Sequence, residues 1–336
     1  MRSCGDNCGD NTSRMTHLHH NRETIYDLER DDEVCVGTTA YTVKGFARGG
    51  MGFILFLERT ADWHSHQLSV HGPKLAIKTV LGGDDDLRSM FKRELTVWAG
   101  LHHPHILNLN EIIEADQTWV AAMDWCEGSL RSYLVSNGRI PQITASKIIT
   151  DLVGALDYAY AKDSVHHLDV KPENVIFTRC FSPEGRFMLS DWGIASVKNE
   201  ALRRTVEMVF YNDQDHTFNN IGTISYMAPE RFKSGHQSSV ASDIFSIGMM
   251  YFELLAGMLP FDLEAPVINQ LNSHAYFDRI EHFSAELGFP NSIREVILGC
   301  VRPNPIHRIS SYGELLKQLA RANRASLPFL SRIFRN

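Results

Sequence analysis

The hydrophobic pattern divides the chain into a strand-rich part followed by a helix-rich part. Short runs of β-branched or aromatic residues predict five strands, at residues 41–43, 53–58, 75–80, 111–113 and 119–123. One stretch with helical spacing of apolar residues, 87–99, interrupts them and predicts a single helix.

Beyond residue 127 apolar residues recur at three- and four-residue spacing, which predicts helices. The main ones are residues 145–161, 241–256, 292–300 and 312–324. We interpret the change of pattern near residues 124–128 as a boundary between two lobes, and we expect the active site at their junction.

The two ends of the chain differ from this pattern. Residues 1–38 are rich in Asn, Asp, Ser, Thr and His with little periodicity, and they predict a flexible N-terminal lead. Residues 326–336 alternate apolar and basic side chains and form a short C-terminal tail. The histidines at 17, 19 and 20 have no cysteine or carboxylate frame, so a solvated cluster is a better interpretation than a metal site.

Composition and charge narrow the class of protein. Hydrophobic residues make up 43% and charged residues 22% of the 336 positions, which is typical of a soluble globular chain. The net charge of −7 gives no reason to expect nucleic-acid binding. The six cysteines are scattered along the chain, which favours free thiols. The start of the chain lacks an apolar leader segment. The longest apolar run, 244–261, is interrupted by Glu253 and Pro260. We therefore expect a cytoplasmic protein without a transmembrane segment.

Six short motifs follow one another along the chain. In order they read ARGGMGFI (47–54), LAIK (75–78), MDWCEGSL (123–130), HLDVKPEN (167–174), DWG (191–193) and GTISYMAPE (222–230). Each motif alone is weak, but the ordered set is specific. Over about residues 41–325 it resembles the signature set of eukaryotic-type serine/threonine protein kinases.

This resemblance implies an α+β, bilobal protein-kinase-like fold with a small β-rich N-lobe carrying helix C and a larger, mostly helical C-lobe. The kinase domain is then expected at residues 39–325, with the N-lobe at 39–124 and the C-lobe at 127–325. It also implies ATP and Mg²⁺ as the cofactors and a protein with a Ser or Thr acceptor as the substrate.

The resemblance assigns nucleotide binding to both lobes. Glycines let a hairpin bring its backbone N–H groups close to the phosphates, and Ala47 replaces one glycine of the family pattern. Met123 matches the gatekeeper, and backbone groups of the linker after it match those that bind the adenine edge. The nucleotide-binding positions are Ala47, Gly49, Gly52, Ile54, Ala76, Lys78, Met123, Asp124, Cys126, Asn174, Ile176 and Asp191.

The resemblance also assigns the phosphoryl-transfer chemistry. Lys78, paired with Glu94 on the predicted helix, matches the lysine that binds the α- and β-phosphates. Asp169 matches the residue that accepts or orients the proton of the substrate hydroxyl, and Lys171 is the residue typical of serine/threonine kinases that steadies the γ-phosphate. The metal ligands of the pattern are Asn174 and Asp191.

Two departures from the family pattern lie beside these residues. Leu168 replaces the arginine that normally binds a phosphorylated activation-loop residue, and Trp192 replaces a phenylalanine. The segment 191–230 contains three residues that could be phosphorylated, Thr205, Tyr211 and Thr217. Because Leu168 cannot bind a phosphate as the arginine would, we hypothesise that activity does not require phosphorylation of this segment.

Supporting residues follow from the same resemblance. We expect an ion pair between Glu230 and Arg308. We also expect a carboxylate at Asp243 that holds the backbone of the catalytic loop, which the resemblance places at the HLDVKPEN motif (167–174). We expect Thr223 to hydrogen-bond with Asp169 and Lys171. Residues matching the family's regulatory spine are Trp98, Leu109, His167 and Trp192.

Two other classes of function compete with an active protein kinase. A pseudokinase acting as a binding scaffold usually lacks a catalytic residue, whereas none is missing here. A small-molecule phosphotransferase shares the aspartate–asparagine pair, but is not expected to carry Lys171 together with Glu230 and Arg308. The insertion at 59–73 and the C-terminal tail are candidate docking elements, and the physiological substrate does not follow from the sequence.

Overall fold

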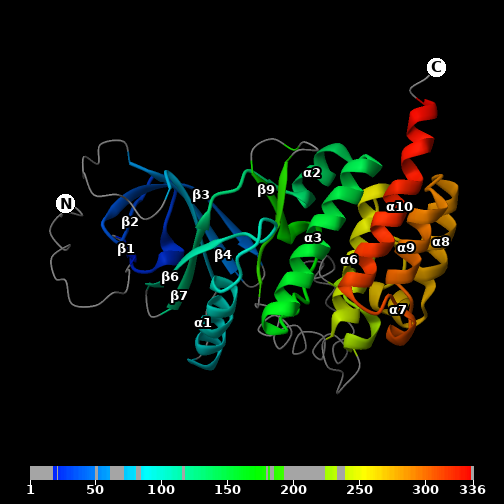
Figure 1. The fold of residues 1–336 in the computed structure, drawn as a ribbon. Coiled ribbons are helices and arrows are strands. Elements are labelled where there is room, and N and C mark those ends of the chain that lie inside the picture. The colour runs from blue at the N-terminus through cyan, green and yellow to red at the C-terminus, as the bar shows by residue number, and fades with distance from the viewer. Residues whose placement is uncertain are drawn as a thin grey trace. The chain divides into compact units, whose positions relative to one another are not determined.

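The computed structural model describes residues 18–20, 22–49, 52–60, 72–80, 85–115, 118–178, 181, 185–192, 224–232 and 239–333. The chain divides into two compact units (Figure 1). The first comprises Met1–His102, Leu107–Cys126 and Trp192–Asp213, and the second comprises His103–Ile106, Glu127–Asp191 and Gln214–Asn336.

The first unit is an antiparallel seven-stranded sheet in the order β1-β2-β3-β4-β5-β7-β6. Strand β1 also contacts β6 at the other end of this order, so the sheet curls. All five predicted strands are confirmed and are longer than predicted. The strands are β1 (Leu18–His20), β2 (Glu33–Val36), β3 (Thr39–Gly49), β4 (Gly52–Arg59), β5 (Lys74–Val80), β6 (Leu109–Ala115) and β7 (Thr118–Asp124).

The predicted helix of the first unit is α1 (Asp85–Ala99). Phe91, Leu95 and Trp98 are buried at the spacing of one helical face, which explains why the pattern was visible in the sequence. The indole Nε1 of Trp98 donates a hydrogen bond to the carbonyl oxygen of Leu107 at 2.7 Å, so the polar N–H group of the buried ring has an acceptor.

The structure corrects the expectation of a flexible lead over residues 1–38. Strands β1 and β2 and the short helix η2 (Ile25–Asp27) lie within this range and belong to the sheet unit. The signal was missed because the strands are too short for their alternation to register, and their apolar side chains find a core only when β2 pairs with β3. Residues 1–17 lie outside the described part. The buried side chains that this segment adds to the sheet core are Leu18, Ile25, Leu28, Val34 and Val36.

The second unit is mostly helical and has a small antiparallel sheet in the order β10-β9-β8. The strands are β8 (Gly128–Ser129), β9 (Val175–Thr178) and β10 (Arg186–Leu189). The helices are α2 (Leu130–Asn137), α3 (Gln142–Asp163), α6 (Val240–Ala256), α7 (Val267–Asn272), α8 (Ala275–Glu286), α9 (Asn291–Cys300) and α10 (Tyr312–Ile333), with single turns η3 (Pro172–Asn174), η5 (Pro229–Phe232) and η6 (Pro305–His307).

Helix α6 is the centre of the second unit and contacts α3, α8 and α9. It is buried from Ser242 to Leu255, so the apolar run noted in the sequence is a core helix. Gly248 lets α9 approach closely, because a Cβ atom there would lie 2.5 Å from Cys300 Cβ.

Three helices of the second unit were not predicted, and α10 extends furthest beyond its predicted bounds. Helices α2, α7 and α8 are short or have mixed polar and apolar faces, whereas α10 continues beyond the predicted end at residue 324 into the expected tail. Within the described residues, no helix combines the length and the apolar character needed to span a membrane.

Candidate active site

In the first unit, the predicted nucleotide-binding residues share one face of the sheet. Ala47 pairs with Ile54, Ile54 pairs with Lys78, and Ala76 pairs with Met123 across neighbouring antiparallel strands. Side chains directly opposite one another point to the same face, as do those two positions apart on one strand, such as Ala76 and Lys78. Five residues from three separate motifs are therefore gathered on one surface.

The opposite face of this sheet is the hydrophobic core of the first unit. Phe53, Leu55 and Ile77 alternate with the nucleotide-binding positions and are at most 1% exposed. This burial fixes the register, because a shift by one residue would turn Lys78 into the core. The core face thus determines where the functional face lies.

The glycine-rich segment forms the end of the β3–β4 hairpin. The strand pairing runs as far as Gly49 opposite Gly52, and residues 50 and 51 between them lie outside the described part. Gly49 and Gly52 therefore form the last pair of the ladder.

Lys78 and Glu94 lie on the elements that the sequence predicted, β5 and α1. Lys78 is half-buried. The side chain of Glu94 lies outside the described part, so the Lys78–Glu94 ion pair stays a prediction.

The linker after β7 is anchored by side chains of the first unit. Asn110 Nδ2 donates a hydrogen bond to Asp124 Oδ1 at 2.9 Å, and the Cys126 thiol lies 3.7 Å from the carbonyl oxygen of Asp124. The ring of Trp125 packs against Phe56, with centroids 5.3 Å apart. Met123, just before, is 5% exposed.

In the second unit, the structure brings two predicted catalytic residues and one predicted metal ligand together. Lys171 Nζ lies 3.0 Å from Asp169 Oδ1. Asn174 Nδ2 donates to Asp169 Oδ2 at 2.9 Å and to the Asp169 carbonyl oxygen at 2.7 Å. Asp169 is 7% exposed, and its carboxylate is thus fixed on both oxygens by charged or amide donors.

The residues predicted to bind a metal offer oxygen ligands. Ser190 donates its backbone N–H and its hydroxyl to the Asn174 carbonyl oxygen, at 2.8 and 3.0 Å, and Asp191 follows directly. Because the amide nitrogen of Asn174 binds Asp169, its amide oxygen is the atom left for a cation. No cluster of three or more His, Cys, Asp and Glu side chains suited to a metal occurs in the described residues. Two oxygen ligands fit Mg²⁺, which usually completes its shell with phosphates and water.

Asp243 confirms the predicted support of the catalytic loop. Its Oδ2 accepts the backbone N–H of His167 at 2.8 Å, and its Oδ1 accepts that of Leu168 at 2.6 Å. The hydroxyl of Tyr312 also donates to Oδ2, at 2.9 Å. A fully buried carboxylate thus receives three hydrogen bonds, which offset the cost of its desolvation.

His167 belongs to the catalytic loop and is fully buried. Its ring lies between the backbone of Asp169 and that of Ser190, the residue before Asp191. Its Nε2 lies 2.8 Å from the carbonyl oxygen of Ser190, and its Nδ1 lies 3.3 Å from the backbone N–H of Asp169. The acceptor at Nε2 and the donor at Nδ1 assign the neutral tautomer with its proton on Nε2. Burial lowers the pKa of His167, although Asp243 opposes this effect.

A partly buried network that the sequence did not reveal lies next to this loop. Arg131 donates to Glu173 Oε1 at 2.7 Å, to Glu253 Oε1 at 2.7 Å and to the hydroxyl of Tyr226 at 2.6 Å, and Tyr226 donates to Glu253 Oε2. Burial lowers the pKa of Arg131, but Tyr226 and the two carboxylates outweigh it and raise the pKa above its ordinary value. The sequence offered one indication of this network, because Glu173 and Tyr226 lie inside two of the six motifs.

The other predicted positions divide into described and undescribed ones. Ile176 is half-buried on β9. Trp98, Leu109, His167 and Trp192 are all buried, as a spine requires. The remaining predicted residues Thr205, Tyr211, Thr217 and Thr223 lie outside the described part.

With this geometry established, comparison with known proteins identifies the family. The model of the protein kinase domain matches residues 68–320, so the chain belongs to the protein kinase family, whose members use ATP. The bilobal α+β fold expected from the motifs is the fold of this family.

Its relatives include serine/threonine kinases of bacteria and plants. The chain is 29% identical to the serine/threonine-protein kinase PrkC of Bacillus subtilis, over 67% of this chain and 32% of the relative. It is 27% identical to the probable serine/threonine-protein kinase PknB of Lactococcus lactis, over 83% and 41%. A plant relative, the CBL-interacting serine/threonine-protein kinase 20 of Arabidopsis thaliana, is 30% identical over 66% and 46%. The chain thus matches less than half the length of each of these relatives.

Proposed function

We propose that this chain is an active serine/threonine protein kinase that transfers the γ-phosphate of Mg-ATP to hydroxyl groups of proteins, including its own. The observation that carries the proposal is the arrangement at Asp169, whose carboxylate lies 3.0 Å from Lys171 Nζ and 2.9 Å from Asn174 Nδ2. An inactive scaffold has no need to hold these three side chains together.

Asp169 is the group that orients the acceptor. Its carboxylate accepts the proton of the substrate hydroxyl as the hydroxyl oxygen attacks the γ-phosphorus. The new bond joins that oxygen to phosphorus, the bond from phosphorus to the β–γ bridging oxygen breaks, and ADP leaves with the electron pair. Lys171, beside Asp169, neutralises charge on the transferring phosphoryl group.

Asn174 and Asp191 are the residues that would hold Mg²⁺. The metal supplies charge neutralisation at the phosphates when it is bound. Asp191 has a backbone φ of 65°, in the left-handed region, and such strain in a non-glycine residue persists where the surroundings enforce it.

The sheet face of the first unit is the proposed nucleotide surface. Ala76, Met123 and Ile54 offer apolar contact to adenine. Lys78, held by Glu94, binds the α- and β-phosphates, and Gly49 and Gly52 bring backbone N–H groups to the phosphates. Backbone groups of Asp124 and Cys126 read the adenine edge.

The proposal is tested by incubating the purified protein with radiolabelled ATP, Mg²⁺ and a generic protein substrate. Wild type is expected to label itself and the substrate, whereas Asp191→Ala and Asp169→Asn are expected to lose nearly all labelling. Asp278→Asn, an exposed carboxylate on α8, is the matched control and is expected to retain activity.

Equal labelling by wild type and Asp191→Ala would refute the active-enzyme proposal. If wild type binds ATP without transferring phosphate, the pseudokinase alternative replaces it. Labelling confined to small hydroxyl compounds would favour the small-molecule phosphotransferase. Replacing Mg²⁺ by chelator in the same assay should abolish labelling, because the phosphate charges are then left uncompensated.

A further inference from the structure

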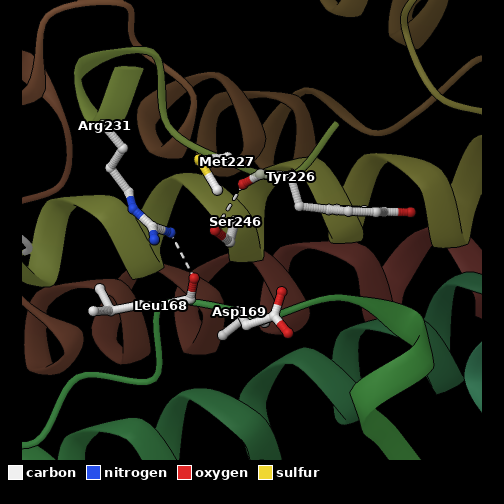
Figure 2. Close-up of a pocket in the computed structure, with 7 residues that line it drawn as sticks. Leu168, Asp169, Tyr226, Met227, Arg231 and Ser246 are labelled. Atoms are coloured by element: carbon white, nitrogen blue, oxygen red, sulfur yellow. Dashed lines mark hydrogen bonds between the residues drawn. The ribbon is translucent and has the colours of Figure 1, made fainter. Parts of the chain in front are cut away.

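Arg231 lies one residue after Glu230, on η5, and contacts the catalytic loop directly. Its Nη1 donates a hydrogen bond to the carbonyl oxygen of Leu168 at 2.5 Å. Figure 2 shows the guanidinium directed at this oxygen, across the small pocket that Leu168, Asp169 and Arg231 help to line. The two segments are 63 residues apart in the chain, so only the tertiary fold brings them together.

Leu168 adopts a backbone conformation that needs support. Its φ is 62°, in the left-handed region that non-glycine residues rarely adopt, and such residues persist only where surrounding contacts enforce them. Two contacts do so here: Asp243 accepts the N–H of Leu168 and Arg231 binds its carbonyl oxygen. The polar backbone groups of the residue before Asp169 are therefore held from both sides.

The carboxylates around Arg231 favour the charged form of its guanidinium. Burial lowers the pKa of this guanidinium, but Asp243, Asp169 and Glu230 oppose the shift, and an arginine stays protonated in proteins. Glu230 is itself bound in two places by Arg308. Arg231 is thus a cation that directly contacts the loop carrying Asp169.

From these contacts we infer that Arg231 is a positioning residue, which sets the orientation of Asp169 through the Leu168 carbonyl and links the loop to the segment that ends at Glu230. The inference rests on the proposed function. Arg231 also gives the catalytic loop a cationic contact at Leu168, whose own side chain carries no charge.

The test compares Arg231→Met, which keeps length and loses the donor, with Arg231→Lys, which keeps a charged donor. For Arg231→Met we expect kcat to fall by about 100-fold with KM for ATP nearly unchanged, because the loop is misplaced while nucleotide contacts remain. Arg231→Lys should restore kcat to within about fivefold of wild type through a charge-assisted hydrogen bond. Arg279→Met, which removes an exposed pair with Asp262, is the matched control and should leave kcat unchanged.

A second measurement does not depend on activity. Amide hydrogen exchange of the segment around residues 165–172 should be faster in Arg231→Met than in wild type and Arg279→Met, because the left-handed turn loses one of its two supports. Inactive wild-type protein would refute the proposed function, and the exchange comparison would still decide the role of Arg231. Unchanged kcat, a loss that Arg231→Lys does not restore, or unchanged exchange would each overturn the inference.

Discussion

Arg308 binds Glu230 through two parallel hydrogen bonds, Nη1 to Oε1 at 2.6 Å and Nη2 to Oε2 at 2.7 Å, and both residues are 5% exposed. The guanidinium also donates to the carbonyl oxygens of Arg302, Ala241 and Pro303. A buried pair of this kind is stable only when every donor is satisfied. The pair predicted from the sequence is therefore confirmed.

Removing one partner of this pair should destabilise the protein strongly. We expect Arg308→Met to lower the free energy of unfolding by about 3–5 kcal/mol, because the Glu230 carboxylate is left buried without its partner. Urea denaturation measures the change. The control is Arg279→Met, whose pair with Asp262 is exposed and should contribute less than about 1 kcal/mol. Equal losses in the two variants would contradict the role assigned to burial.

Gly248 should not tolerate a methyl group. In Gly248→Ala the added Cβ meets Cys300 Cβ at 2.5 Å and Val301 Cγ1 at 2.7 Å, so α6 and α9 must separate. The expected loss is about 1–3 kcal/mol, as for other overpacked cores.

Gly154, on α3, is the matched control because a Cβ atom there meets nothing within 4 Å. Gly154→Ala should be neutral or stabilise by up to about 1 kcal/mol, since alanine favours the helix. Thermal denaturation of both variants gives the comparison, and a stable Gly248→Ala protein would contradict the close packing of α6 on α9.

The N-terminal segment, residues 18–36, should contribute to the free energy of unfolding because it packs on the sheet of the first unit. Ile25 is fully buried in the core of the first unit, so Ile25→Ala is expected to cost about 2–5 kcal/mol. Val135→Ala, at a side chain that is 78% exposed, serves as the control and should change stability by less than about 0.5 kcal/mol. Similar denaturation curves for wild type and Ile25→Ala would argue that the segment does not fold onto the sheet.

His167 should make stability depend on pH. Its pKa in the folded protein lies below the ordinary value of 6.5, so the unfolded chain binds a proton first as the pH falls. The stabilising contribution is therefore complete above about pH 6.5 and is lost progressively as the pH falls toward the folded pKa.

The measurement is urea denaturation at about pH 7 and about pH 5, with His167→Phe as a variant that cannot titrate. Wild type should lose more stability between the two conditions than the variant, whatever the absolute stability of each. An equal loss would show that His167 does not resist protonation.

Motif order identified most of the candidate site, because phosphoryl transfer demands certain side chains at fixed spacings. Asp169, Lys171 and Asn174 lie within one short loop, and their mutual contacts follow from local geometry. The sheet residues were also predictable, since strand alternation places Ala76 and Lys78 on one face.

The network of Arg131 and the contact of Arg231 could not be predicted in this way. Arg131 joins residues 42, 95 and 122 positions away, and nothing in its local sequence separates it from a solvated surface arginine. Long-range polar contacts depend on how helices pack, which local patterns do not encode.

The sequence by itself determined the kinase family, the candidate catalytic residues and the strands and helices with strong periodicity. These features rest on local spacing and on residue chemistry. Only the tertiary structure decided that residues 18–36 complete the sheet of the first unit and that the Leu168 carbonyl is bound by Arg231. Short strands acquire a buried face only through pairing, and a left-handed residue is retained only where distant partners hold it.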